Sequence, residues 1–250
     1  MNTVIEEIHR TGVVFDGQGQ EYPAHSHIDP AEGAFVGDLI RRDASVLETL
    51  EVGCAYGLSS LHICDALSGR DGAHHTIIDP FQHSEWHGVG LANLERAGFT
   101  GYTWRDELSE LALPEIAKQE AGTFDLVFID GCHTFDHTLL DLFYAIRLVR
   151  VGGYIVLDDC IMPPVAKAAA YVLNYPALEL FSQVEMPRRE MTWRRRGAAL
   201  LNRLTPRLAR DWIVPRALYD RFFYRFEFST MIALRKIAED ERGIHWFEPF

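Results

Sequence analysis

Short apolar runs alternate with stretches of helical periodicity along most of the chain. The apolar runs occupy residues 46–52, 75–79, 124–130, 152–159 and 229–236. Stretches such as 59–67 and 138–149, which lie between these runs, have the amphipathic pattern of surface helices. Near-continuous apolar strands that alternate with helices are typical of parallel sheets covered on both faces. We therefore expect an open, mostly parallel α/β sheet.

The composition fits one folded domain. A chain of 250 residues with 48% hydrophobic content can bury a full core. The N-terminus, MNTVIEEIHR, has acids where a signal peptide has basic residues, and no apolar run approaches the roughly 18 residues of a membrane span. We expect a soluble, cytoplasmic protein with an N-terminal lid or helical segment over 1–45 and the main domain over 46–250.

The four cysteines are interpreted as reduced thiols. They show no CxxC pairing and lie inside apolar segments, at positions 54, 64, 132 and 160. Neither a disulfide framework nor a structural zinc site is expected from these spacings.

The net charge of −12 is unevenly distributed. Residues 188–225 contain 11 arginines and three acidic residues, so this stretch carries +8 and the rest of the chain −20. The acidic balance elsewhere argues against a general nucleic-acid-binding protein. We interpret residues of about 188–226 as a basic helical insertion. It could contact a membrane surface or a phosphorylated or lipid-linked acceptor, mediate homo-oligomer formation, or pack as a cap on the acidic body.

A glycine-containing turn follows the first apolar run in the segment LEVGCAYGLSS. It places Glu51, Gly53 and Gly57 before a helix that is expected to begin near Ser59. The spacing differs from the GxGxxG dinucleotide fingerprint and lacks a phosphate-binding lysine. An acid in this turn favours a cationic ligand such as an adenosyl sulfonium, and Asp79 at the end of the next strand is suited to the ribose hydroxyls. The alternative is a tight strand-to-helix turn with Asp79 as a cap.

Four motifs carry a resemblance to a known family. LEVGCAYGLSS, IIDPFQ, FIDGCHTFD and RVGGYIVLDD, in this order and spacing, resemble the class I S-adenosylmethionine-dependent methyltransferases. Within them the chain looks most like the metal-dependent O-methyltransferases of the sugar and natural-product type. The match runs over about 28–172 and resumes near Ser229.

The resemblance implies a seven-stranded, Rossmann-like sheet and a binding set for the methyl donor. The implied contacts come from Glu51, Gly53, Gly57 and Asp79, and we include Ser59 at the start of the helix. An acid after the third strand often contacts the adenine in this family. Asp106 and Glu107 are the candidates here, and Asp106 is assigned to the cofactor set.

Three carboxylates follow two apolar runs that are 28 residues apart. Asp130 closes one run, and Asp158 and Asp159 close the next after a helical crossover. Adjacent parallel strands end side by side, so these acids are expected to converge and to repel one another without a cation. A hard ion such as Mg²⁺ suits them and would lower the pKa of an acceptor hydroxyl. Alternatively, Asp158 or Asp159 caps the helix that begins near Pro163.

The resemblance adds roles for these residues. Sugar-type relatives bind magnesium at the positions of Asp130, Asp158 and Asp159, and some use a histidine at the position of His133 as general base. Neutral histidine is a suitable proton acceptor at pH 7 because its ordinary pKa is near 6.5. The alternative is a loop histidine whose hydrogen bonds are simply satisfied.

Several aromatic residues near these motifs are weaker candidates. His83, Trp86 and His87 could line the adenine or acceptor pocket, and Trp86 could form a stacking wall or belong to the core. His25 and His27 lie on a segment that could close over the site.

Three functions remain open from the sequence. The favoured one is magnesium-dependent O-methyl transfer to a hydroxyl of a small molecule, sugar or glycolipid. The others are an RNA-binding methyltransferase that uses the arginine-rich stretch and a noncatalytic cofactor-binding scaffold. The net acidity weakens the RNA hypothesis, and the acids at the strand ends weaken the scaffold hypothesis because binding a nucleoside requires none of them.

Overall fold

The computed structural model describes residues 2–25, 28–186, 193, 197 and 229–247 and contains a seven-stranded sheet. The strand order is β5-β4-β3-β6-β7-β9-β8, in which β9 runs antiparallel to both of its neighbours and β3 to β7 are parallel. The strands are β3 (Glu48–Val52), β4 (His74–Ile78), β5 (Tyr102–Arg105), β6 (Phe124–Ile129), β7 (Val149–Leu157), β8 (Leu178–Glu185) and β9 (Ser229–Lys236). The predicted open α/β sheet is confirmed.

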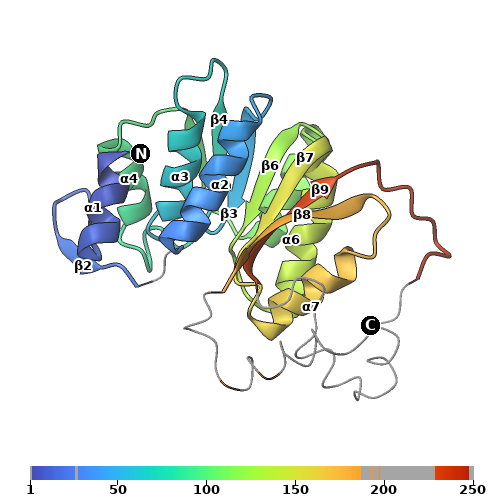
Figure 1. The fold of residues 1–250 in the computed structure, drawn as a ribbon. Coiled ribbons are helices and arrows are strands. Elements are labelled where there is room, and N and C mark those ends of the chain that lie inside the picture. Colours follow the sequence, from blue (N-terminus) through green and yellow to red (C-terminus); the bar gives the residue numbers. More distant parts are fainter. Residues whose placement is uncertain (1, 26–27, 187–192, 194–196, 198–228, 248–250) are drawn as a thin grey trace.

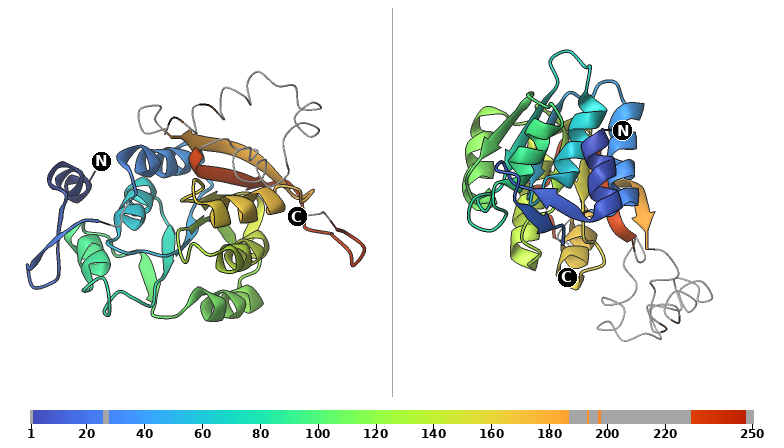
Figure 2. Two further views of the ribbon diagram at one scale, coloured as in Figure 1. Left: turned by 90° about the horizontal axis from the view of Figure 1, so that it is seen from below. Right: turned by 90° about the vertical axis from the view of Figure 1, so that its left-hand side faces the viewer.

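Helices cover both faces of the sheet (Figures 1 and 2). One apolar core packs helices α1, α2, α3 and α4 on one face, and a second core packs α5, α6 and α7 on the other. The helices are α1 (Thr3–Thr11), α2 (Pro30–Arg42), α3 (Leu58–Leu67), α4 (Val89–Arg96), α5 (Ser109–Gln119), α6 (Phe135–Leu148) and α7 (Pro163–Val172). All six residues of β6 are buried, as a central strand covered on both faces requires.

The N-terminal segment also contains a small hairpin of β1 (Val13–Phe15) and β2 (Glu21–Pro23) between its two helices. The division of the chain at residue 45 stays a prediction. The expected basic insertion lies outside the described residues, except for positions 193 and 197. None of the described helices is long and apolar enough to cross a membrane.

The sheet has a topological switch point between β3 and β6. From β3 the chain order proceeds outward to β4 and β5 on one side, whereas β6 begins the other half of the sheet. The carboxyl ends of β3 and β6 are neighbours, and Val52 pairs in register with Ile129. Ligands of open α/β sheets bind beyond such strand ends, so the fold places the glycine turn and Asp130 at the expected location.

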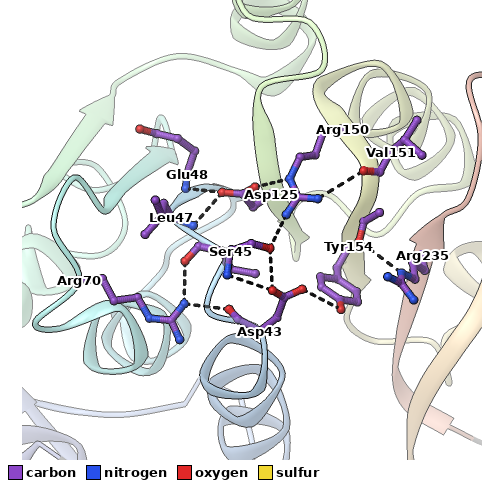
Figure 3. A network of polar contacts seen from close by, with 12 residues as sticks. Asp43, Ser45, Leu47, Glu48, Arg70, Asp125, Arg150, Val151, Tyr154 and Arg235 are labelled. Atoms are coloured by element: carbon purple, nitrogen blue, oxygen red, sulfur yellow. Dashed lines mark hydrogen bonds and ion pairs between the residues drawn. The ribbon is translucent and has the colours of Figure 1, made fainter.

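A network of ion pairs and hydrogen bonds closes the opposite, amino end of the sheet (Figure 3). The Asp125 carboxylate accepts hydrogen bonds from the amides of Leu47 and Glu48 at 2.7 and 2.8 Å and from the Arg150 guanidinium. Arg70 donates to the carbonyl oxygens of Ile40, Asp43 and Val46. These contacts fix the chain entering β3 to the start of β6, and so they hold both halves of the switch point together.

Candidate active site

The glycine turn after β3 depends on two close backbone contacts. Gly53 and Gly57 have φ values of 86° and 81°, a region that side-chain-bearing residues rarely adopt. A Cβ on Gly53 would lie 2.1 Å from the carbonyl oxygen of Asp130, and one on Gly57 would lie 2.8 Å from that of Gly90. The glycines therefore let the turn pack against its protein neighbours, which sets the shape of the cavity above it.

Asp79 anchors this turn from the end of β4. Its buried carboxylate accepts hydrogen bonds from the amides of Cys54 and Ala55, both at 2.9 Å, and from the amide of Phe81 at 2.8 Å. The Gln82 side chain donates a further bond at 3.1 Å. Asp79 thus holds the turn through its backbone amides, but the N-cap of α3 is Gly57. Asp79 also lines the cavity described below.

Glu51 points beneath the turn rather than into the cavity. The side chain is fully buried, accepts a hydrogen bond from the Ser60 hydroxyl and lies 3.1 Å from Nε2 of His75. Its Oε1 atom has no hydrogen-bond partner among the described residues. A buried carboxylate oxygen left in this way favours a donor or cation nearby. Ser59 is also buried, at the start of α3.

A cavity of about 400 Å³ opens beyond the ends of β3, β4, β6 and β7. Its described lining combines the glycine turn with five carboxylates, one histidine and two aromatic rings, and includes no lysine or arginine. The lining residues are Glu32, Gly53, Ala55, Asp79, Phe81, Trp86, Asp130, Gly131, Cys132, His133, Asp158 and Asp159.

Asp130, His133 and Asp159 form the tightest group in this cavity. His133 Nε2 lies 3.1 Å from Asp130 Oδ1 and 3.3 Å from Asp159 Oδ2, and all three ligand atoms lie within 4.8 Å of one another. Asp158 faces the same cavity but stands outside this group; its Oδ1 accepts the Asp159 amide at 2.7 Å. Asp159 has a φ of 52°, an uncommon backbone conformation that accompanies the turn after β7.

The carboxylates raise one another's proton affinity. Burial raises the pKa of Asp130 to about 6, although the hydrogen bond with His133 opposes the shift. Burial raises the pKa of Asp158 well above its usual range, and the charges of Asp130 and Glu32 add to this effect. The hydrogen bond to Asp130 raises the pKa of His133. The site therefore favours a bound cation or proton.

The expected capping alternative for the acids after β7 is wrong. The N-cap of α7 is Met162, and no side-chain hydrogen bond caps that helix. Asp159 contributes only its carbonyl oxygen, which accepts the Met162 amide at 2.8 Å. The side chains of Asp158 and Asp159 are thus left to the cavity.

The remaining candidates are distributed unequally around the site. Trp86 lines the cavity and packs edge-to-face on Tyr56, whose hydroxyl lies 2.9 Å from His25. His87 stacks on Tyr22, and His83 packs on Trp104, so neither lines the cavity. His27 lies outside the described residues.

The two candidates for the adenine contact do not reach this cavity. Asp106 is exposed, and Glu107 is paired with Arg105 at 3.3 Å. The assignment of Asp106 to the cofactor set stays a prediction.

All four cysteines are free thiols, but they do not share the buried environment that was expected of them. Cys54, Cys64 and Cys160 are buried, whereas Cys132 is exposed and lines the cavity beside His133.

Comparison with known proteins identifies the kind of domain. Residues 50–160 match a family model described as a methyltransferase domain, and this range contains the glycine turn and all the acids after β4, β6 and β7. This part of the chain is therefore similar to a methyltransferase domain.

Curated and solved proteins agree with this assignment. A catechol O-methyltransferase of Niastella koreensis is 29% identical over 136 residues, which cover 54% of this chain and 58% of that protein. The O-methyltransferase from Bacillus cereus, solved in complex with SAH, is 17% identical with a TM-score of 0.61 and covers 94% of this chain and 92% of its own. TomG from Streptomyces achromogenes, solved with SAM, is 18% identical with a TM-score of 0.54, covering 64% and 75%. At these identities the solved structures support the fold.

The cavity has one carboxylate that sequence reasoning missed. Glu32 comes from α2, outside the motifs at the strand ends. The segment Asp29-Pro-Ala-Glu32 has the spacing of a capping box, which the structure contains: Asp29 caps α2 and its amide donates to Glu32 at 2.8 Å. That signal predicts the helix start but not that Glu32 faces a cavity. Phe81 was also missed as a lining residue.

Proposed function

We propose that this chain is a magnesium-dependent O-methyltransferase that transfers the methyl group of S-adenosylmethionine to a hydroxyl of a small-molecule acceptor. The observation that carries the proposal is that two groups of residues, each suited to a different ligand, line one cavity. The glycine turn and Asp79 form the half suited to a nucleoside, and Asp130, His133 and Asp159 form the half suited to a cation. A nucleoside-binding scaffold would need only the first half.

The cofactor half comprises the end of β3 and the end of β4. Gly53 and Asp79 line the cavity directly, while Gly57, Glu51 and Ser59 support the turn from below. A positively charged sulfonium is favoured here because the cavity has an excess of carboxylates and no described lysine or arginine.

The metal half comprises the ends of β6 and β7. Oxygen ligands from Asp130, Asp158 and Asp159 suit Mg²⁺, which when bound lowers the pKa of an acceptor hydroxyl. His133 is proposed as the general base. Its Nε2 lies between two carboxylates, which stabilise the protonated ring after it has accepted a proton.

The acceptor class is proposed from the relatives. The curated relative acts on catechol, so a catechol is a reasonable first acceptor, with sugar and glycolipid hydroxyls as the alternatives from the sequence. A cytoplasmic location, and membrane-surface or homo-oligomer contacts through residues 188–226, remain proposals.

Titration calorimetry of chelator-treated protein tests this function. We expect S-adenosylmethionine to bind with a Kd on the order of 10 μM, and added Mg²⁺ to occupy a separate site. Asp159→Asn should lose the metal site but keep cofactor affinity within about threefold. Asp38→Asn, which removes an exposed carboxylate on α2 outside this cavity, is the matched control and should keep both sites. No cofactor binding by folded protein would refute the proposal.

A further inference from the structure

Glu32 is the one cavity carboxylate that comes from the N-terminal segment of the chain. It lies in the first turn of α2 and is 9% exposed. Its Oε2 atom is held by the Asp29 amide at 2.8 Å, and no other hydrogen bond to its carboxylate is formed within the described residues. Because the residue lines the cavity, its free oxygen faces the open space.

Glu32 lines the cavity from α2, together with Asp158 and Asp159 at the end of β7. Asp79 and the glycine turn line the cofactor half, at the ends of β4 and β3. Glu32 therefore borders the space that remains for the acceptor once the cofactor occupies its own half.

Charge balance restricts what that space can accept. Five carboxylates line the cavity, and the described lining contains no lysine or arginine. With all five carboxylates ionised and His133 neutral, the two positive charges of a divalent ion and the net one of S-adenosylmethionine leave two negative charges uncompensated. An anionic acceptor would add to them in a partly buried site where Coulomb interactions are strong.

We infer that Glu32 is a specificity-determining residue that selects acceptors with a positively charged or neutral substituent and discriminates against carboxylate- and phosphate-bearing acceptors. This inference rests on the proposed function. Glu32 can perform this role because its hydrogen bond to Asp29 fixes the side chain in place. A fixed carboxylate pairs with an ammonium group at lower entropic cost than a mobile surface side chain does.

Three catechols with an ethyl chain that ends in an ammonium group, in hydrogen or in a carboxylate test the inference: dopamine, 4-ethylcatechol and 3-(3,4-dihydroxyphenyl)propanoate. Their affinities are measured by calorimetry on full-length protein loaded with Mg²⁺ and S-adenosylhomocysteine, so that no turnover is needed. The wild type should prefer dopamine to the propanoate. In Glu32→Gln this preference should fall by about tenfold, with 4-ethylcatechol little changed.

Glu32→Gln is a clean variant because glutamine also completes a capping box, so α2 should keep its start. Asp38→Asn removes one charge from the same helix outside this cavity and should retain the wild-type preference. Equal preference in wild type and Glu32→Gln, or no binding of any of the three catechols, would overturn the inference. Binding of S-adenosylhomocysteine in the same samples separates that result from failure of the proposed function.

Discussion

The two ends of the sheet use buried acids in opposite ways. At the amino end, Asp125 is paired with Arg150 and with two backbone amides (Figure 3). Arg70 donates hydrogen bonds to three backbone carbonyl oxygens there. At the carboxyl end, Asp130 and Asp158 lie beside further carboxylates and no described arginine or lysine lines their cavity. Acids paired with arginine hold the strands together, whereas acids that lie beside one another cost stability until a cation binds. The comparison indicates which end is structural and which is functional.

The largest expected effect concerns Asp158. Asp158→Asn should lower metal-dependent turnover by about 1,000-fold or more, which corresponds to about 4 kcal/mol in the activation barrier. It should also raise the free energy of unfolding of metal-free protein, because one buried like charge is removed. Methyl transfer to a catechol and urea denaturation measure the two effects. A variant that is inactive and also less stable would show that Asp158 belongs with the structural acids.

Removal of Asp125, the acid paired with Arg150, should lower the stability of the protein rather than raise it. Asp125→Ala leaves two amides and Arg150 without their acceptor, so the free energy of unfolding should fall by about 3 to 4 kcal/mol. Urea denaturation of the variant, beside Asp71→Ala as an exposed control, measures the loss. A loss below about 1 kcal/mol would contradict the structural role of this network.

Asp141, a further acid at the carboxyl end of the sheet, should make the stability of the protein depend on pH. Burial of this α6 carboxylate raises its pKa to about 6, although a hydrogen bond with Ser109 opposes the shift. Folding favours the protonated form of Asp141. The contribution of this form to the free energy of unfolding is therefore fully present below pH 3.8 and is lost as the pH rises through 6.

Asp141→Asn should therefore gain stability over the wild type by up to about 3 kcal/mol between pH 4 and pH 7. Urea denaturation of both proteins at a series of pH values tests this, because all other groups titrate alike in the two. A difference that stays constant with pH would show that Asp141 has a normal pKa.

The smallest effect expected is that of Gly53→Ala. The added Cβ would collide with the Asp130 carbonyl, and the backbone has a positive φ, so we expect a loss of about 2 kcal/mol in unfolding free energy. Because Asp130 would shift as well, metal affinity should fall together with cofactor affinity. Calorimetry with each ligand checks this; a loss confined to the cofactor would show that the turn and Asp130 move independently.

Sequence periodicity was sufficient to predict most of the sheet but not its edges. The apolar runs at 75–79 and 124–130 match β4 and β6 closely, since central strands are buried on both faces. β5 and β8 are half exposed, and their mixed patterns gave no such signal.

The candidate site was predictable to the level of strand ends. Asp79, Asp130, Asp158 and Asp159 could be placed because parallel strands end at one edge. The direction in which the Glu51 side chain points could not be predicted. It depends on His75 of the neighbouring strand, with which Glu51 forms a buried contact. Long-range packing of α2 likewise decides that Glu32 faces the cavity.

The pairing of the last two strands has a consequence for how such a domain can diverge. Glu185 and Ser229 are register partners, so the chain leaves the sheet and returns to it at a single point, near the carboxyl end of β7. Lengthening a connection costs little entropy and changes no register. The connection between β8 and β9 can thus change in length without a change in the register of the residues that hold the sheet together.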